Sequence, residues 1–317
     1  MNNNKISIIV PVYNVEKYVR ATLNSIKQQI VKPDEVIIIN DGSTDNSSKI
    51  ILEYKNLKNW KIINTKNNGL GLTRNYGKRI AKGNYIYFLD SDDLITKDLV
   101  SDFKKIVNKY KYPDIILFSG TVLNMNNKFT PKLNLKFSFT GLYKKNDKLI
   151  TKLIKKKESF PQASRYITKK KIWSDNDLNY PKGIFEDEAI FFPLLALSKC
   201  TVILTKAYFK YRTGRKNSIM HSAFTSNHAK NYLDLIRYKI KFIKKNYDLI
   251  KPDLKAWHIR LLRNTLRYID LCLKTDSKIL WNDVFMILLI TKKPSFLIKI
   301  IYTFAIDSHV LLSFHGY

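Results

Sequence analysis

The stretch Tyr85-Ile86-Tyr87-Phe88-Leu89-Asp90-Ser91-Asp92-Asp93 joins an apolar, aromatic run directly to three carboxylates packed into four positions. The pattern predicts a buried strand that carries acids at its carboxyl end, where ligands bind in open α/β sheets. Crowded carboxylates repel one another unless a proton or a cation intervenes, and a hard divalent ion with oxygen ligands suits them. The alternative is a polar turn or helix N-cap, because Asp and Ser favour both.

The chain before this stretch alternates between short apolar strands and amphipathic helices. We expect strands at residues 6–10, 35–40 and 61–64, the first of them stopped by Pro11. We expect helices at 15–30, at about 72–81, and between them one that Ser43 or Thr44 caps and that carries Ile51, Tyr54 and Leu57. This order predicts an α/β fold with a mostly parallel sheet that is covered by helices on both faces. The polar segments 11–14, 41–43 and 90–93 each follow a strand, so they should converge on one edge of the sheet.

Composition indicates a globular protein with a basic surface. The chain has 317 residues, is 45% hydrophobic and carries a net charge of +30, which favours polyanions such as nucleic acid, anionic lipid or phosphorylated substrates. An abundance of Lys, Asn and Ile throughout the chain is an alternative source of this charge. Cys200 and Cys272 lack metal-ligand spacing and are expected to be free thiols in a reducing compartment. We see neither a signal peptide nor an apolar segment of about 18 residues that would span a membrane.

The glycines after the third strand do not form a dinucleotide fingerprint. Gly69-Leu70-Gly71 follows the third strand rather than the first, and Arg74 stands where the pattern needs its third glycine. The sequence has no P-loop either, so a nucleotide would have to be held in another way.

Four motifs, in order and with matching spacing over roughly residues 5–220, resemble the family 2 glycosyltransferases of the GT-A fold, of the type that builds bacterial surface polysaccharides. A lone Asp-x-Asp is weak, but four ordered motifs are specific. They are Ser7-Ile8-Ile9-Val10-Pro11-Val12-Tyr13-Asn14, Asn40-Asp41-Gly42-Ser43-Thr44-Asp45, Gly69-Leu70-Gly71-Leu72-Thr73-Arg74-Asn75-Tyr76-Gly77 and Asp90-Ser91-Asp92-Asp93.

This resemblance implies an inverting transferase that uses a nucleotide-diphosphate sugar, a UDP-hexose or UDP-N-acetylhexosamine, together with Mn²⁺ or Mg²⁺. By position, Asp41 would accept a hydrogen bond from uracil, Asp90 would reach the ribose or the metal, and Asp92 would ligate the metal. A carboxylate suits each of these tasks. The other implied donor-binding residues here are Pro11, Tyr13, Asn14, Arg74 and Ser91. Simple packing of Tyr13 and a surface salt bridge of Arg74 are the structural alternatives.

A second acidic cluster, Glu186-Asp187-Glu188, precedes an apolar helical run. The plain interpretation is a helix N-terminus, where acids are favoured. Sugar transfer with inversion also needs one carboxylate to take the proton of the acceptor hydroxyl. The segment resembles the family's Glu-Asp motif, which places this base at Asp187, with Glu186 and Glu188 as alternatives.

The segment 208–221 resembles the one that closes the catalytic domain in relatives. Arg212 or Arg215 would then contact the diphosphate, and His221 would lie near the metal, although a lone His is often structural. Arg165 falls in an acceptor-side segment and would contact phosphate or solvent.

The C-terminal third changes character to basic, aromatic-rich helices, predicted at residues 229–247, 254–273, 279–290 and 296–306. Such helices suit a membrane interface; a bundle packed on the catalytic domain or a homo-oligomer interface is the alternative. We therefore expect a GT-A catalytic domain at 1–225, with its nucleotide-sugar half at about 1–118 and its acceptor half at about 119–225. A helical region at 226–317 follows.

The expected function is sugar transfer to a glycan, lipid-linked, in the synthesis of O-antigen, capsule or lipooligosaccharide. The expected location is cytoplasmic, peripheral on the inner face of the membrane. Nucleic-acid binding is disfavoured, because no RRM, KH or helix-turn-helix pattern accompanies the charge. A nucleotidyltransferase is disfavoured as well, because no glycine-rich basic loop follows the first strand.

Overall fold

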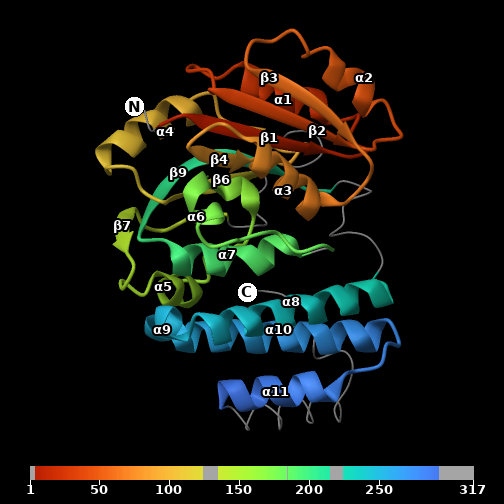
Figure 1. Cartoon of the computed structure of the whole chain (residues 1–317), viewed down its shortest axis with the longest axis vertical. Helices are drawn as coiled ribbons and strands as arrows, with labels where there is room; N and C mark the ends of the chain where they lie inside the picture. Colours follow the sequence, from red (N-terminus) through yellow and green to blue (C-terminus); the bar gives the residue numbers. More distant parts are fainter. Residues whose placement is uncertain (1–3, 124–134, 184, 215–223, 293–317) are drawn as a thin grey trace. The chain divides into compact units, whose positions relative to one another are not determined.

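The computed structural model describes residues 4–123, 135–183, 185–214 and 224–292 (Figure 1). The chain divides into two compact units, one of residues 1–147 and 160–221 and one of residues 148–159 and 222–317. Residues 148–159, expected above in the acceptor half, therefore group with the C-terminal helices.

The first unit is built on a mixed sheet in the strand order β3-β2-β1-β4-β8-β6-β9-β5, with β7 paired to β9. Its first four strands in that order are parallel: β1 (Ile6–Val12), β2 (Glu35–Asp41), β3 (Trp60–Thr65) and β4 (Tyr85–Phe88). β8 (Tyr166–Lys169) lies antiparallel between β4 and β6 (Ile115–Leu123), and β9 (Cys200–Arg212) runs parallel to β6. The short strands β5 (Leu94–Ile95) and β7 (Gly141–Lys144) pair antiparallel with β9.

Helices cover both faces of this sheet, as side-chain alternation along β1 shows. Ile8 and Val10 share a core with Leu23 of α1 and Phe103 of α4, whereas Ile9 faces α3. The first face carries α1 (Val19–Lys27), α2 (Ser47–Leu52) and α4 (Leu99–Lys109), and the second carries α3 (Leu70–Ile80) and α6 (Lys170–Ser174). The single turn η1 (Ala163–Arg165) and the helix α7 (Glu186–Leu197) complete the unit. The predicted α/β class, a mostly parallel sheet between helices, is confirmed.

The helix α3 lies unusually close to the sheet. A Cβ added to Gly77 would stand 2.5 Å from Cγ2 of Ile9, a contact that real side chains do not make. Since Ile9 is β-branched and held in the centre of the sheet, it cannot swing away cheaply. Glycine at this position therefore fixes the distance between α3 and β1, and with it the depth at which the side chains of α3 sit.

The predicted end of the first strand at Pro11 is wrong, because β1 continues to Val12. Leu89 donates its N–H to the carbonyl of Ile9, so residue 9 turns its polar groups toward β4, and residue 11 has the same orientation. β4 ends at Phe88, opposite Ile9. An N–H at position 11 would therefore point to the side of β4, where that strand has already ended. Proline at this position thus costs the sheet no hydrogen bond.

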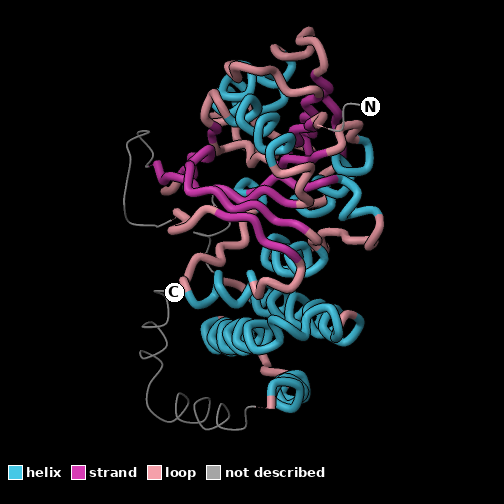
Figure 2. Tube along the Cα trace, turned by 90° about the vertical axis from the view of Figure 1, so that its left-hand side faces the viewer, coloured by secondary structure: helices cyan, strands magenta, loops and turns pink. Residues whose placement is uncertain are grey.

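The second unit is helical and comprises α5 (Leu149–Lys155), α8 (Ser226–Lys245), α9 (Tyr247–Ile250), η3 (Lys251–Asp253), α10 (Leu254–Lys274) and α11 (Trp281–Thr291). α8 and α10, labelled in Figure 1, lie side by side in both views (Figures 1 and 2). Phe242 of α8 is stacked on Trp257 of α10 at 5.4 Å between ring centroids. Arg237 of α8 pairs with Asp283 of α11 at 2.8 Å. The helices predicted at 229–247, 254–273 and 279–290 are confirmed, and the one at 296–306 lies outside the described residues. None of the described helices combines the length and apolarity needed to cross a membrane.

Candidate active site

The loops after β1 and β2 are joined to each other at the carboxyl edge of the sheet. Asn14 donates its N–H to Oγ of Ser43 at 3.2 Å, and its side-chain oxygen accepts from the N–H of Thr44 at 2.8 Å. Beside them Tyr13 is 47% exposed, whereas Pro11 is buried in the strand. Two of the three polar segments predicted to converge are therefore in direct contact.

Asp41 organises the next loop along this edge. Its side chain is buried and accepts hydrogen bonds from Thr65 Oγ1 at 3.0 Å, from the N–H of Asn68 at 3.1 Å and from the N–H of Gly69 at 2.9 Å. The carboxylate thus fixes the start of α3. Among the described residues its Oδ2 accepts only from Gly69, which leaves that oxygen a second lone pair for a ligand.

The acidic segment after β4 forms a tight turn, in which the N–H of Asp93 donates to the carbonyl of Asp90 at 3.1 Å. The segment therefore has the backbone of a polar turn, which was the alternative interpretation. This turn also brings the three carboxylates close together in the chain. Arg212, at the end of β9, donates its N–H to Oδ1 of Asp93 at 2.8 Å and its Nε to the carbonyl of Asp92 at 2.9 Å. The Thr22 hydroxyl donates to the carbonyl of Ser91 at 2.9 Å.

Asp93 is the most enclosed of these acids. Its Oδ2 is buried without a hydrogen-bond partner in the described part of the chain. Burial, followed by the charges of Asp92 and Asp90, raises the pKa of Asp93 well above its usual range. The segment is therefore electrostatically unfavourable as three bare anions, and a proton or a cation would relieve it.

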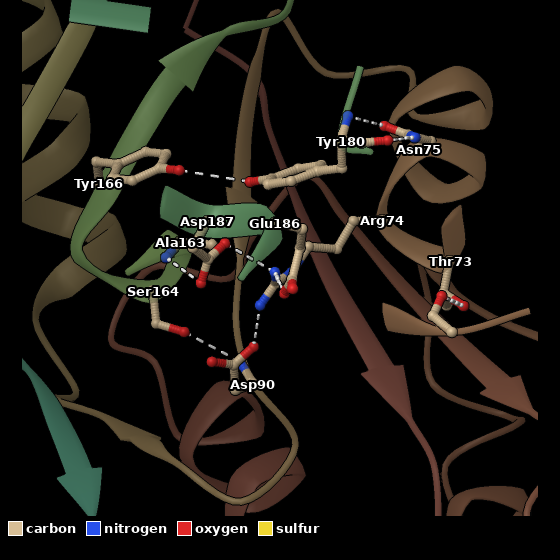
Figure 3. Close-up of polar contacts among 11 residues, drawn as sticks. Thr73, Arg74, Asn75, Asp90, Ala163, Ser164, Tyr166, Tyr180, Glu186 and Asp187 are labelled. Atoms are coloured by element: carbon tan, nitrogen blue, oxygen red, sulfur yellow. Dashed lines mark hydrogen bonds and ion pairs between the residues drawn. The ribbon is translucent and has the colours of Figure 1, made fainter. Parts of the chain in front are cut away.

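Arg74 lies at the centre of the site (Figure 3). Its side chain is fully buried, and its NH1 donates to Glu186 Oε1 and Asp187 Oδ1, both at 2.8 Å, while its NH2 donates to Asp90 Oδ1 at 2.6 Å. The guanidinium carbon also stands 5.3 Å from the ring centre of Tyr180. Burial opposes the charge, but the three carboxylates outweigh it and raise the pKa of Arg74 well above its usual value. One cation thus joins the acids after β4 to the acids at the start of α7.

Three carboxylates around a single guanidinium leave an excess of negative charge. Burial raises the pKa of Asp187 to about 8; Arg74 opposes this shift, and the charges of Glu186 and Asp90 add to it. Burial likewise raises the pKa of Glu186, again against the opposing charge of Arg74. The Asp187 side chain remains 18% exposed, and its Oδ2 accepts from the N–H of Ala163 at 3.2 Å. A partly exposed, oriented carboxyl that titrates near neutrality suits a general base.

The backbone around these acids is fitted closely to α3. A Cβ on Gly71 would lie 2.6 Å from the carbonyl of Pro181, and Asn75 exchanges two hydrogen bonds with the backbone of Tyr180, at 2.8 and 2.9 Å. Phe185 adopts φ of +67° immediately before α7, so the first turn of the helix presents its acids to Arg74. Glu186 and Asp187 also lie at the positive end of the helix dipole.

Several of these supporting residues were not predicted. Asn75 lies within the glycine-containing motif, and that position could have indicated its role. The Ser164 hydroxyl accepts a hydrogen bond from the N–H of Asp90 at 3.1 Å, and Ser164 lies in the acceptor-side segment noted in the sequence. Tyr180 had no signal in the sequence. Arg165 is buried and donates to the carbonyl of Leu135 at 2.8 Å, so the expectation that it could be solvated is wrong. Arg215 and His221 lie outside the described residues.

The comparison with known proteins agrees with this geometry. The family model of glycosyl transferase family 2 matches residues 7–173. The chain belongs to glycosyl transferase family 2. The matched span contains the loops after β1, β2 and β4 together with Arg74, and it ends before Asp187, so the assignment of Asp187 depends on the contacts described above.

Relatives within the family include transferases of bacterial glycans. The chain is 31% identical over 229 residues to the poly(ribitol-phosphate) β-N-acetylglucosaminyltransferase TarS of Staphylococcus aureus. That aligned region covers 70% of this chain and 38% of TarS. It is 25% identical over 296 residues to glycosyltransferase GlyG of Streptococcus pneumoniae. That aligned region covers 85% of this chain and 94% of GlyG. The chain thus spans well under half of TarS and most of GlyG.

The fold is shared with a solved structure of TarS residues 1–349, crystallised in complex with UDP-GlcNAc. The TM-score is 0.65 at 22% sequence identity, over 84% of this chain and 81% of that one. The GT-A fold expected from the resemblance is therefore confirmed.

The burial of Arg74 makes a prediction about stability and pH. Arg74→Met should lower the free energy of unfolding by about 3–5 kcal/mol at about pH 8, because three carboxylates lose the buried cation that pairs with all of them. The loss should shrink toward about pH 5. Without Arg74, the pKa values of these carboxyls in the folded protein lie further above their values in the unfolded chain, about 4, so the folded variant takes up protons as the pH falls and is stabilised by them. Urea denaturation over this pH range measures both effects.

Arg20→Met is the matched control, because Arg20 pairs with Glu53 at the surface, where both side chains are about half exposed. This substitution should change stability little at either pH. A loss for Arg74→Met that is equally small, or that does not depend on pH, would contradict the buried bridge.

Proposed function

We propose that the protein is an inverting glycosyltransferase that moves a sugar from a UDP-sugar, a UDP-hexose or UDP-N-acetylhexosamine, to a hydroxyl of a glycan acceptor. The observation that carries this proposal is the Arg74 bridge, which joins Asp90 on the donor side to Asp187 on the acceptor side. Supporting it are the relatives named as glycosyltransferases, among them TarS, which is named for N-acetylglucosaminyl transfer and was crystallised with UDP-GlcNAc.

In this proposal Asp187 is the general base. It removes the proton of the acceptor hydroxyl as that oxygen attacks the anomeric carbon, while the bond from this carbon to the diphosphate breaks on the opposite face. Arg74 and the N–H of Ala163 hold both carboxyl oxygens of Asp187 in place. Glu186 is less suited, because its side chain is only 9% exposed. The alternative base Glu188 is buried as well.

The donor lies along the carboxyl edge of β1, β2 and β4. The exposed ring of Tyr13 packs on the nucleobase, with Pro11 and Asn14 shaping the pocket, and the second lone pair of Asp41 Oδ2 accepts from the uracil N–H. Arg74 acts on the donor through Asp90, which faces the ribose. Ser91 and Arg212 are the other described residues that we propose to contact the donor. The donor contact of Arg215 and the metal binding of His221 stay predictions from the sequence.

The proposal includes Mn²⁺ or Mg²⁺ at Asp92. Among the described residues no three His, Cys, Asp or Glu side chains are grouped so as to hold an ion. Mg²⁺ at nucleotide sites commonly takes one or two carboxylates and completes its shell with substrate phosphates and water, so a partial set is sufficient. The carboxyl pair of Asp92 and Asp93, with one orphaned oxygen, fits such a set. When bound, the ion neutralises the charge of the departing diphosphate.

The base assignment is tested with the purified protein, Mn²⁺, a panel of UDP-sugars and UDP release as the readout. Asp187→Asn should lower UDP release by about 10²–10⁴-fold, because the attacking water or hydroxyl keeps its proton, while the affinity for UDP stays unchanged. The base acts when deprotonated, so kcat/KM should rise with pH through an apparent pKa near that of Asp187, about 8, which belongs to the coupled acids together.

Asp175→Asn is a control for the loss of one acid, since this residue is exposed on the segment that leads to α7. It should leave UDP release unchanged. If Asp187→Asn releases UDP at the rate of the unsubstituted protein, the base lies elsewhere and Glu186→Gln is the next variant.

We further propose a lipid-linked acceptor in bacterial surface-polysaccharide synthesis and a peripheral location on the inner face of the cytoplasmic membrane. What supports membrane contact is the surface of α11, where Trp281, Phe285 and Leu289 follow one another at intervals of four residues and are 39%, 48% and 78% exposed. An apolar face of this kind, on a unit rich in Lys and Arg, fits the interface of an anionic bilayer.

Membrane contact predicts that the protein sediments with anionic phosphatidylglycerol vesicles. Phe285→Ser together with Leu289→Ser should weaken this binding by about tenfold, because each removes apolar area from the bilayer. Ile30→Ser with Val31→Ser is the control, since these side chains are also exposed, at 63% and 40%, but lie in the first unit. Unchanged sedimentation of the α11 variant would contradict the proposal. An unsubstituted protein that is dimeric and becomes monomeric with these substitutions would indicate a homo-oligomer interface instead.

A further inference from the structure

A pocket whose lining includes none of Arg74, Asp90, Glu186 and Asp187 lies on the second face of the sheet, between α3 and α6. It has a volume of about 510 Å³, within the range of small-molecule sites. Its lining is rich in cations and includes a single acid. The lining residues on which the argument depends are Tyr76, Lys78, Arg79, Lys170, Ser174 and Asp177.

Lys78 is buried in the wall of this pocket, and no carboxylate of the described residues lies within 4.0 Å of its Nζ. Its Nζ donates to the carbonyl of Leu178 at 2.5 Å and to Oδ1 of Asn179 at 2.8 Å, and it stands 4.9 Å from the ring centre of Trp173. An ammonium has three N–H donors, and these contacts use two of them with neutral acceptors. Burial lowers the pKa of Lys78 to about 8, against a small opposing effect of Asp177. The Lys78 ammonium is therefore fixed in position by neutral acceptors, and its positive charge is not balanced by a nearby carboxylate of the described residues.

The other two cations of the pocket have neutral partners as well. Arg79 lies over the ring of Tyr76 at 5.1 Å, and Lys170 donates to the carbonyl of Ala81 at 2.5 Å. None of the three pocket cations has a described carboxylate within 4.0 Å, whereas Lys104 and Lys206 in the same unit each have one at 2.5 Å.

The single acid of the pocket does not balance this charge. Asp177 accepts a hydrogen bond from Asn179 at 3.0 Å, so its nearest described partner is an amide rather than a cation. Three cations from two helices and one acid leave a net positive pocket, and an anion entering it would gain charge-assisted hydrogen bonds.

The size and the donors of the pocket favour a compact, highly charged group. A guanidinium fork and two ammonium groups match the several oxygens of a phosphate better than a single carboxylate. The volume accommodates a monosaccharide-sized ligand. Tyr76 and Ser174 bring hydroxyl groups to the same lining, which suits the hydroxyls of a sugar or polyol.

We propose that this pocket binds the phosphate of a sugar- or polyol-phosphate, at a site separate from that of the UDP-sugar, through Lys78, Arg79 and Lys170. Assigning this ligand to the acceptor rests on the proposed function, whereas phosphate binding itself does not. On that assignment the enzyme holds a phosphate-bearing unit of its acceptor at some distance from the hydroxyl that reacts.

The test is calorimetric titration of the full chain with glycerol 3-phosphate and, separately, inorganic phosphate, at constant ionic strength and with saturating UDP. UDP fills the proposed donor site, so any remaining binding reports on another site. Glycerol 3-phosphate should bind more tightly than inorganic phosphate if a polyol is recognised. Arg79→Gln with Lys170→Gln should weaken binding by at least about tenfold. Lys171→Gln, which removes one exposed charge from the same helix outside the pocket lining, should change it by no more than about twofold.

Lys78→Met tests the buried cation directly, although it also removes two hydrogen bonds that hold residues 178 and 179. The Arg79 and Lys170 variants avoid this risk, and unchanged UDP release from a UDP-sugar would show that they are folded. Absence of phosphate binding to the unsubstituted protein, or equal affinity in the Arg79/Lys170 variant, would overturn the proposal. Phosphate binding without UDP release from any UDP-sugar would contradict the transferase function but leave this site intact.

Discussion

The site depends on one buried guanidinium. Arg74 is fully enclosed and bonds Asp90, Glu186 and Asp187, so it connects the strand β4 to the start of α7, more than 90 residues later in the chain. Burial of an unpaired charge is very costly, so neither the cation nor the ionised acids are stable in this space without the other. The glycines of α3 make the arrangement sterically feasible, because Gly77 lets the helix approach β1 and Gly71 lets residue 181 approach the helix. Sheet packing and site geometry are thus set by the same helix.

The same ion cluster gives the acids different tasks. Asp90 and the segment that follows it are held by Arg74, Ser164 and Arg212, and in our proposal they face the donor and its ion. Asp187 keeps part of its surface exposed, yet burial raises its pKa; Arg74 opposes this shift, and the charges of Glu186 and Asp90 add to it. In water an aspartate is a weak base, so in our proposal burial among like charges is what suits this carboxyl to accept the proton of the acceptor hydroxyl.

Much of the first unit was predictable because its information is local. Apolar runs of strand length, each followed by a polar segment, gave the parallel order of β1 to β4 and the edge where their loops meet. Pro11 was misjudged because its tolerance depends on where β4 ends, which is a tertiary fact. The partners of Arg74 were equally hidden, since Glu186 and Asp187 lie 112 and 113 residues away. The grouping of residues 148–159 with the C-terminal helices depends on contacts such as that of Thr151 with Asp253, which no local pattern signals.

The central claim is that Arg74 and Asp187 are energetically coupled in the folded protein. A double-mutant cycle with Arg74→Met, Asp187→Asn and the combined variant, followed by urea denaturation at neutral pH, measures this coupling directly. The contact at 2.8 Å in a buried site predicts a coupling free energy of about 1–3 kcal/mol. Additive losses, with a coupling free energy near zero, would contradict the account.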